Sequence, residues 1–393
     1  MTTTDTQVTA PSLPVTDLYA KLLRNEPLFI LDVRNAEDFK RWGVEGRSAL
    51  EVVNLPYYDF IEDEEGSIAR VPADRDILVI CAKEGASQYV AELLQGQGIQ
   101  AAYLEGGIAS WGNFYDIRDV VNKPSGRIVQ IARPARGDLS FMVISDGVAA
   151  IVDPLRHIEY YLTVAQEANV TIKEIFDTHI HADHISGGPA LAQRLGVPYY
   201  VHAYDAIHPI DMLPAKIDYH HLVDGQTFTI GQFSLKVVWF PGHTLGQVNY
   251  LFTAPDGDSY LFTGDGIFLS SFGRPDLGGK GETWTPMLYQ SMFERLPQHI
   301  TDDTMILPAH FSHLDEGGDN GLFVEPFGTV RQQNDGLKPR TLEEFTSYVL
   351  GHLPVFPPEY VEIKRVNIGL TIPNEEQASE LELGKNICAL SNA

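Results

Sequence analysis

Short apolar runs that end in polar residues alternate with longer amphipathic stretches near the start of the chain. Runs rich in β-branched residues occupy 28–34 (LFILDVR) and 77–83 (ILVICAK), and each precedes a helix-like stretch, AEDFKRW and ASQYVAELLQ respectively. A third run, AAYLEGG at 101–107, leads into IASWGNF. Because strands that alternate with helices form parallel sheets, this pattern predicts an α/β unit whose parallel sheet is flanked by helices.

The pattern changes after a polar stretch at 116–127, which we interpret as a linker because it contains Pro124 and Gly126. Short strand-like runs then follow closely, beginning with IVQIAR, FMVISDG and AAIVDP, and 157–170 is a helix candidate. Further runs are EIFDTHIH, VPYYVHA, FSLKVVWFPGH, SYLFTGD and TMILPAH. This rhythm predicts a sandwich of sheets with helices outside them. The segment 314–340, rich in Gly, Asp and Asn, is predicted to be a loop.

The length of the chain indicates how many domains it has, and its charge excludes some classes of partner. A chain of 393 residues is too long for one ordinary domain, and we predict two, residues 1–120 and residues 121–393. The formal charge of −25 would repel nucleic acid and anionic membranes, so neither is an expected partner. The first residues show no basic stretch followed by an apolar one, and the chain has only two cysteines. We therefore expect a soluble, cytoplasmic protein, and a homo-oligomer is compatible with the sequence.

Aspartate or histidine closes several strand-like runs of the second domain. Because carboxyl ends of neighbouring strands meet at one edge of a sheet, these side chains are expected to converge. Imidazole and carboxylate groups are ligands for zinc or iron, and the set is large enough for one or two ions. The candidates are His179, His181, Asp183, His184, His243, Asp265 and His310, with Asp153 at a further strand end. The remaining histidines of this region are interpreted as hydrogen-bonded surface residues; they are His202, His208, His220 and His221.

The motifs THIHADH (178–184), PGHT (241–244), LFTGD (261–265) and PAH (308–310) resemble those of the metallo-β-lactamase fold superfamily. The resemblance covers about residues 126–393 and implies an αββα sandwich with a metal at one edge. The superfamily includes thioester hydrolases, phosphodiesterases, flavo-diiron oxidases and dioxygenases, so the fold alone does not select an activity.

The segment SFGRPDLGG (271–279) is similar to one that follows the TGD motif in persulfide dioxygenases, iron enzymes that oxidise glutathione persulfide to sulfite. That resemblance implies one Fe(II) per chain, held by His179, His243 and Asp265. Two imidazoles and one carboxylate leave open positions for a persulfide sulfur and O₂. Arg274 is expected to bind substrate through its guanidinium.

The other motif residues have two interpretations. In a dioxygenase, His181, Asp183, His184 and His310 would form hydrogen bonds that fix the orientation of the ligands. In a zinc hydrolase similar to glyoxalase II, the same four residues would hold a second metal. A hydrolase of thioesters is therefore the alternative, with Zn replacing Fe(II).

Cys81 lies between a predicted strand and the helix that begins near Ala86. Free backbone N–H groups and the positive end of a helix dipole favour a thiolate at such a place. A free cysteine without such a setting is more often a small buried apolar residue. Cys388 has no comparable setting in the sequence, and we assign it no role.

The motifs LDVRNAEDF (31–39), CAKEGAS (81–87) and YLEGGIASW (103–111) together resemble the rhodanese domain, a sulfurtransferase, over about residues 12–118. The resemblance implies that Cys81 carries sulfane sulfur as a persulfide, with Lys83 and Ser87 as binding residues of its loop. The loop has Ala86 where rhodaneses often have arginine, so persulfide transfer is a better expectation than thiosulfate chemistry.

Both resemblances concern sulfane sulfur, and together they lead to one hypothesis. The protein is expected to be a bifunctional enzyme of sulfide detoxification: its iron domain oxidises a low-molecular-weight thiol persulfide with O₂ to sulfite, and Cys81 transfers sulfur to or from a thiol or sulfite acceptor. Besides the zinc hydrolase, a third interpretation makes the rhodanese-like unit a silent binding or dimerisation module.

Overall fold

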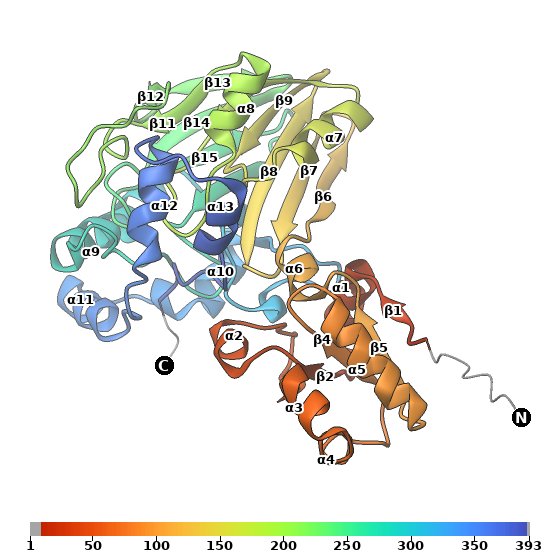
Figure 1. Cartoon of the computed structure of the whole chain (residues 1–393). Coiled ribbons are helices and arrows are strands. Elements are labelled where there is room, and N and C mark those ends of the chain that lie inside the picture. Colours follow the sequence, from red (N-terminus) through yellow and green to blue (C-terminus); the bar gives the residue numbers. More distant parts are fainter. Residues whose placement is uncertain (1–8, 391–393) are drawn as a thin grey trace, which may run out of the picture.

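The computed structural model describes residues 9–390, which form three β-sheets (Figure 1). The N-terminal sheet is parallel throughout, in the order β1-β5-β4-β2-β3. Its strands are β1 (Ser12–Leu13), β2 (Phe29–Asp32), β3 (Glu51–Asn54), β4 (Ile77–Ile80) and β5 (Ala101–Leu104). Its helices are α1 (Val15–Leu23), α2 (Ala36–Arg41), α3 (Tyr57–Glu62), α4 (Glu64–Ile68), α5 (Gly85–Gly96) and α6 (Gly107–Gly112).

Helices cover both faces of this sheet, which explains why its central strands β2 and β4 are buried along their whole length. Alternate residues of a strand point to opposite faces: Leu78 packs in one core with α1, and Val79 packs in another with α5. The predicted parallel α/β unit is confirmed.

The chain from residue 116 onward contains two mixed sheets. The seven-stranded sheet has the order β12-β11-β10-β9-β8-β7-β6, and the six-stranded sheet has the order β13-β14-β15-β16-β17-β18. The strands of the first are β6 (Asp116–Lys123), β7 (Gly126–Arg133), β8 (Asp138–Ser145), β9 (Val148–Val152), β10 (Thr171–Phe176), β11 (Tyr199–His202) and β12 (His220–Leu222). Those of the second are β13 (Thr227–Ile230), β14 (Phe233–Trp239), β15 (Val248–Thr253), β16 (Ser259–Gly264), β17 (Met305–Pro308) and β18 (Glu325–Pro326).

The two sheets pack face to face through an apolar core. Phe141 of β8 and Phe262 of β16 meet with their ring centroids 5.3 Å apart. Met142, the next residue of β8, points the other way into a second core beneath α7 (Glu159–Glu167) and α8 (Gly188–Leu195). Helices also cover the six-stranded sheet, where Leu288 and Phe345 join the central core. The predicted αββα sandwich is therefore confirmed.

The remaining helices belong to this outer layer and to the C-terminal part of the chain. They are α9 (Gly281–Tyr289), a π-helical turn (Gln290–Arg295), α10 (Phe327–Gln333), α11 (Leu342–Gly351), α12 (Glu359–Asn367) and α13 (Glu375–Leu381), with short 3₁₀ turns at Leu296–Gln298, Leu314–Glu316 and Asp335–Leu337. None of the helices within residues 9–390 has the length and apolar character needed to cross a bilayer.

Two predictions about connections are wrong. Residues 116–123 of the predicted linker form β6, which pairs with β7 as an antiparallel hairpin at the edge of the sheet. Its mixed polar pattern is typical of an edge strand that is open to solvent on one side. The predicted loop at 314–340 includes β18 and α10, because Phe327 and Val330 provide apolar contacts with the central core.

Glu382, which follows α13, ties the C-terminal segment to the sandwich. Its buried carboxylate accepts hydrogen bonds from Arg133 of β7 at 2.7 Å, from Arg156 at 2.9 Å and from the backbone N–H of Ile185 at 2.8 Å. Burial alone raises the pKa of this carboxyl group, but the guanidinium groups of Arg133, Arg136 and Arg156 outweigh burial and lower the pKa of Glu382 to about 2.

The substitution Glu382→Gln is expected to destabilise the fold by about 3 kcal/mol near neutral pH, because it removes one partner from a buried ion cluster. The carboxylate contributes this stability above its ordinary pKa of 4.5 and loses it as the pH falls toward about 2. Urea unfolding should therefore show a difference between wild type and variant that is constant above pH 4.5 and shrinks below it. Glu380→Gln, in an exposed ion pair with Arg41, is the control and should cost little. A difference that does not vary with pH would contradict this account.

Candidate metal centre

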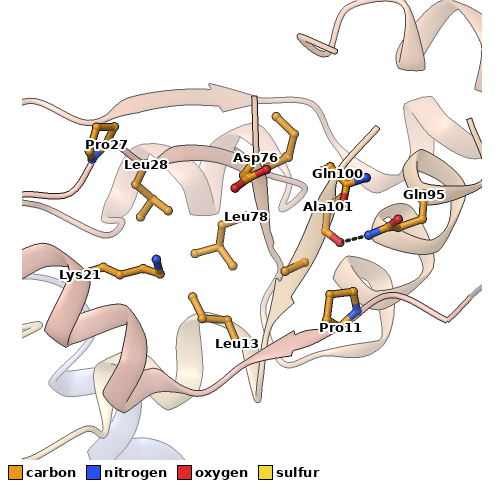
Figure 2. Close-up of a pocket in the computed structure, with 12 residues that line it drawn as sticks. Pro11, Leu13, Lys21, Pro27, Leu28, Asp76, Leu78, Gln95, Gln100 and Ala101 are labelled. Carbon is orange, nitrogen blue, oxygen red and sulfur yellow. Dashed lines mark hydrogen bonds between the residues drawn. The ribbon is translucent and has the colours of Figure 1, made fainter. Parts of the chain in front are cut away.

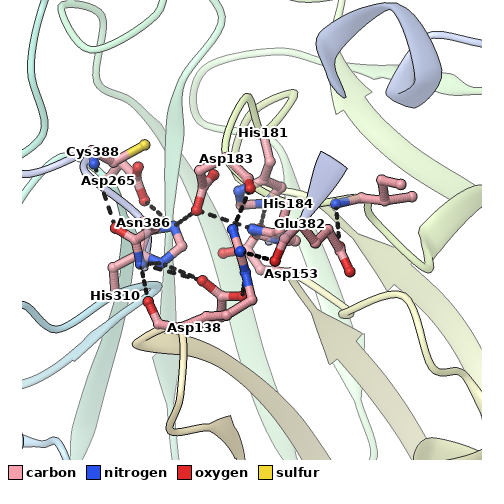
Figure 3. A network of polar contacts seen from close by, with 12 residues as sticks. Asp138, Asp153, His181, Asp183, His184, Asp265, His310, Glu382, Asn386 and Cys388 are labelled. Carbon is pink, nitrogen blue, oxygen red and sulfur yellow. Dashed lines mark hydrogen bonds and ion pairs between the residues drawn. The ribbon is translucent and has the colours of Figure 1, made fainter. Parts of the chain in front are cut away.

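The predicted ligands converge at one edge of the sandwich, where strands of both sheets end. Figure 3 shows part of this cluster, around Asp183, Asp265 and His310. The loop 178–184 follows β10, and Asp153 follows β9, both in the seven-stranded sheet. His243, Asp265 and His310 come after β14, β16 and β17 of the six-stranded sheet. All of these side chains are at most 2% exposed. The cluster is thus built from strand ends, as the spacing in the sequence predicts.

The three residues predicted to bind iron lie around one carboxylate oxygen. The Nε2 atom of His243 is 3.3 Å from Asp265 Oδ2, and the Nε2 atom of His179 is 3.8 Å from the same oxygen. None of these three atoms has a hydrogen-bond partner within the described residues. Buried polar atoms of native proteins are normally satisfied, so this gap is the place expected for a cation.

Hydrogen bonds fix which ring nitrogens face the gap. Nδ1 of His243 donates to the carbonyl oxygen of Arg274 at 2.8 Å; since a carbonyl only accepts, Nε2 keeps its lone pair. Nδ1 of His179 contacts the hydroxyl of Thr178 at 3.1 Å, again leaving Nε2 free. Burial lowers the pKa of both imidazoles well below 6.5. Both rings are neutral and ready to bind a metal.

His181 is oriented by a carboxylate. Its Nε2 atom lies 3.2 Å from Asp153 Oδ1, and its Nδ1 atom is without a hydrogen-bond partner. Asp153 also accepts a hydrogen bond from the backbone N–H of Thr178 at 2.6 Å, and its own backbone is left-handed (φ 51°). A non-glycine residue in that conformation is strained, which is common at functional sites. Asp153 therefore fixes the start of the ligand loop as well as one of its rings.

A second group lies on the other side of Asp265. Ligand atoms of His181, Asp183, His184 and His310 lie within 4.8 Å of one another. Nε2 of His310 is 3.1 Å from Asp183 Oδ2 and 3.2 Å from Asp265 Oδ1, so Asp265 lies between the two groups. The structure thus offers donors for a second ion as well, as both interpretations of these residues allow.

The buried negative charge of the centre favours the binding of a metal cation. Burial raises the pKa of Asp265 to about 6. Burial alone would lower the pKa of His310, but the carboxylates of Asp183 and Asp265 outweigh it and raise the pKa to about 10. Without a metal, the proton on His310 balances part of the buried negative charge. A divalent ion would replace that proton and satisfy the free ligand atoms.

The sequence predicts a substrate-binding role for Arg274, and the structure gives this residue another one. Its side chain is fully buried, and every guanidinium nitrogen donates to a protein acceptor. These acceptors are the carboxylate of Asp276 and the carbonyl oxygens of Pro354, Val355 and Ile387. No donor is left for a substrate, so Arg274 organises the chain around His243.

Several residues that support the centre were not predicted. Asp205 accepts hydrogen bonds from the N–H of Ile180 and the hydroxyl of Thr244, and so joins the loops of two ligand motifs. Asp138 lies 3.4 Å from Nδ1 of His310. Cys388 comes from the C-terminal segment, and its thiol lies within 4.8 Å of ligand atoms of His243 and Asp265. No short motif marks these residues, because each approaches the centre from a distant part of the chain.

The other histidines lie outside the centre. His220 and His221 are exposed on β12, and His202 is half-buried against Trp239. The prediction of a surface position is wrong for His208, which is 1% exposed and contacts the carbonyl oxygen of Val361 through Nε2. Its role is structural, since this contact joins the loop after β11 to α12.

Cys81 directly follows β4 and faces the N-terminal end of α5. Its Sγ atom is 3.1 Å from Oγ of Ser87, whose hydroxyl donates to the carbonyl oxygen of Glu84 at 2.8 Å. Ser87 therefore accepts from the thiol. Lys83 is exposed. Gly107 closes the loop tightly, because a Cβ atom there would come within 2.5 Å of the carbonyl oxygen of Cys81. The predicted loop is present, with its thiol 5% exposed.

A cavity of about 290 Å³ in the same domain is unrelated to this thiol (Figure 2). Its lining includes Ile77 and Ala101, which begin β4 and β5. Cys81 lies at the carboxyl end of β4, where ligands of parallel sheets usually bind. The cavity is at the opposite end of the sheet.

Two family models match the two parts of this architecture. Residues 134–338 match the metallo-beta-lactamase superfamily, and residues 15–114 match the rhodanese-like domain. A hydroxyacylglutathione hydrolase of Rhodospirillum rubrum is 36% identical over 197 residues, covering 50% of this chain and 68% of that protein. A metallo-beta-lactamase structure from Staphylococcus aureus has a TM-score of 0.52 at 25% identity, covering 65% of this chain and 72% of that one. The structure of ETHE1 from Myxococcus xanthus has a TM-score of 0.49 at 21% identity. The match covers 64% of this chain and 98% of that one.

The substitution Asp265→Asn should weaken metal binding by at least about 100-fold, since changing even a residue that orients a ligand often costs about 10–100-fold. Dialysis against a range of free metal concentrations, followed by elemental analysis, measures the effect. His221→Gln is the matched control and should bind metal as the wild type does. Equal metal content in the Asp265 variant and the wild type would show that the ion binds elsewhere.

Proposed function

Because the chain belongs to the metallo-beta-lactamase superfamily and carries a rhodanese-like domain before that unit, we propose that it oxidises a thiol persulfide and transfers sulfane sulfur. The substrate proposed is glutathione persulfide. In the reaction, R–S–SH, O₂ and H₂O give R–SH, SO₃²⁻ and two protons. The observation that carries the proposal is the pairing, in one chain, of a sulfane-sulfur domain with free donor atoms of His179, His243 and Asp265.

The proposed cofactor is one Fe(II), and the donor set fits it. Two imidazoles and a carboxylate on one side of the ion leave positions at which a sulfur atom and O₂ can bind together. The chain's own contribution is positional: the Arg274 carbonyl and Asp153 hold the rings of His243 and His181 in a single tautomer. Complete burial of the ligands keeps bulk water away from the reacting sulfur.

Cys81 would carry the sulfur-transfer step. Its thiolate attacks the outer sulfur of a persulfide, the S–S bond breaks, and the thiol R–SH leaves with the proton. The new Cys81 persulfide then gives its outer sulfur to a thiol or to sulfite, which becomes thiosulfate. The first turn of α5, which begins at Gly85, provides backbone N–H groups that would bind the anionic sulfur of the persulfide.

The proposal is tested on full-length protein purified without oxygen. We expect iron as the bound metal, O₂ uptake on addition of glutathione persulfide, and one sulfite formed per O₂ consumed. Asp265→Asn should abolish uptake, and His221→Gln should leave it unchanged. Bound zinc together with absent O₂ uptake would refute the dioxygenase function.

A zinc-dependent thioester hydrolase is the second candidate. It is favoured by the donors for a second ion at Asp183, His184 and His310 and by the hydroxyacylglutathione hydrolase among the relatives. This candidate requires two metals per chain and hydrolysis of a lactoyl thioester of glutathione under nitrogen. The same preparation assayed for both reactions separates the two functions.

Replacing Cys81 by Ser should abolish persulfide transfer to sulfite while O₂ uptake with glutathione persulfide persists, because the two sites use different residues. Thiosulfate formation measures the sulfur transfer, and O₂ uptake by the same preparation measures the oxidation. Ser12→Ala, at an exposed serine of β1 in the same domain, is the control. If thiosulfate formation is the same with and without the Cys81 thiol, the rhodanese-like domain is a silent module.

A further inference from the structure

Cys388 lies close to two of the three residues proposed to bind iron, and Figure 3 shows it beside one of them, Asp265. Its thiol and ligand atoms of His243 and Asp265 are within 4.8 Å of one another, and all three residues are 0% exposed. The His243 Nε2 atom and Asp265 Oδ2 have no hydrogen-bond partner within residues 9–390, whereas Asp265 Oδ1 lies 3.2 Å from Nε2 of His310. The thiol itself has only a long contact, 3.7 Å, with the hydroxyl of Tyr360. The Cys388 thiol, His243 Nε2 and Asp265 Oδ2 are therefore three buried donor atoms with little else to satisfy them.

The C-terminal segment is held so that this thiol stays in place. Arg274 donates its backbone N–H to the carbonyl oxygen of Cys388 at 2.8 Å, and Gly273 forms a β-bridge with Ala389. The carbonyl oxygen of the same Arg274 accepts the hydrogen bond from His243. One residue thus fixes the metal-binding face of His243 and the position of Cys388.

We propose that Cys388 is a sulfur ligand of the metal held by His243 and Asp265. The S–H bond breaks, a sulfur–metal bond forms, and the proton leaves to water, as thiol ligands require. The inference rests on the metal centre of the proposed function but not on its reaction, since thiolate binds both iron and zinc.

This ligand changes how substrate reaches the centre. Two imidazoles and a carboxylate leave open positions on one side of an ion, and the thiolate of Cys388 takes one of them. A persulfide sulfur must then displace Cys388 or bind beside it. The C-terminal segment is thereby part of the site and gives the resting centre one sulfur donor.

Cobalt(II) reports this ligand through a thiolate-to-metal absorption band in the near ultraviolet. Full-length apoprotein loaded with one equivalent of Co²⁺, with a phosphine as the only reductant, should show the band. Cys81→Ser should keep it, and Cys388→Ser should lose it while retaining the weaker visible bands of bound cobalt. X-ray absorption of zinc-loaded protein should show a sulfur neighbour at about 2.3 Å in wild type and Cys81→Ser.

The wild type and the Cys81 variant decide the question even if Cys388→Ser does not fold. Only nitrogen and oxygen neighbours in the wild type would overturn the proposal, as would a charge-transfer band that survives in Cys388→Ser. A protein without O₂ uptake but with the sulfur ligand would refute only the dioxygenase function. O₂ uptake without a sulfur neighbour would refute only the role of Cys388.

Discussion

Unsatisfied donor atoms at the edge of the sandwich are the constraint on which the site depends. Five histidines and two aspartates meet there in a volume that is closed to solvent. Three of the histidines come from one loop, and the other two come from other strand ends. Leaving a polar group buried without a partner costs about 1–3 kcal/mol each, which a fold does not sustain without compensation. A divalent cation held by His179, His243 and Asp265 would compensate the donor atoms on its side of Asp265, so metal binding also stabilises this edge of the fold.

The surrounding chain makes that interaction specific. Asp153, Asp205 and Asp138 each hold a ligand or its loop from outside the cluster, and Arg274 does so through its backbone. Such partners decide which ring nitrogen faces the ion. Their hydrogen bonds therefore contribute to the metal affinity in addition to the ligands themselves. Cys388 extends the arrangement with a soft donor. The C-terminal segment, anchored by Glu382, therefore belongs to the chemistry of the centre as well as to its packing.

The sequence predicts those parts whose information is local. The runs that became β2, β4, β8 and β16 were legible because both of their faces are buried, and each ligand motif directly follows a strand. The edge strand β6 was not recognised in the sequence, since half of its residues face solvent. The orienting residues Asp138 and Asp205 and the thiol of Cys388 approach the centre from distant segments, which no spacing in a motif encodes. Arg274 was placed in the right loop, but only packing shows that its donors are used within the protein.

The central claim is that one iron ion lies beside Asp265, between His179 and His243. The most direct measurement is anomalous scattering, recorded above and below the iron absorption edge, from crystals of protein purified without oxygen. We predict a single iron peak next to Asp265 Oδ2, within bonding distance of both imidazoles. Two zinc peaks bridged by Asp265, with one of them against Asp183 and His310, would contradict the account.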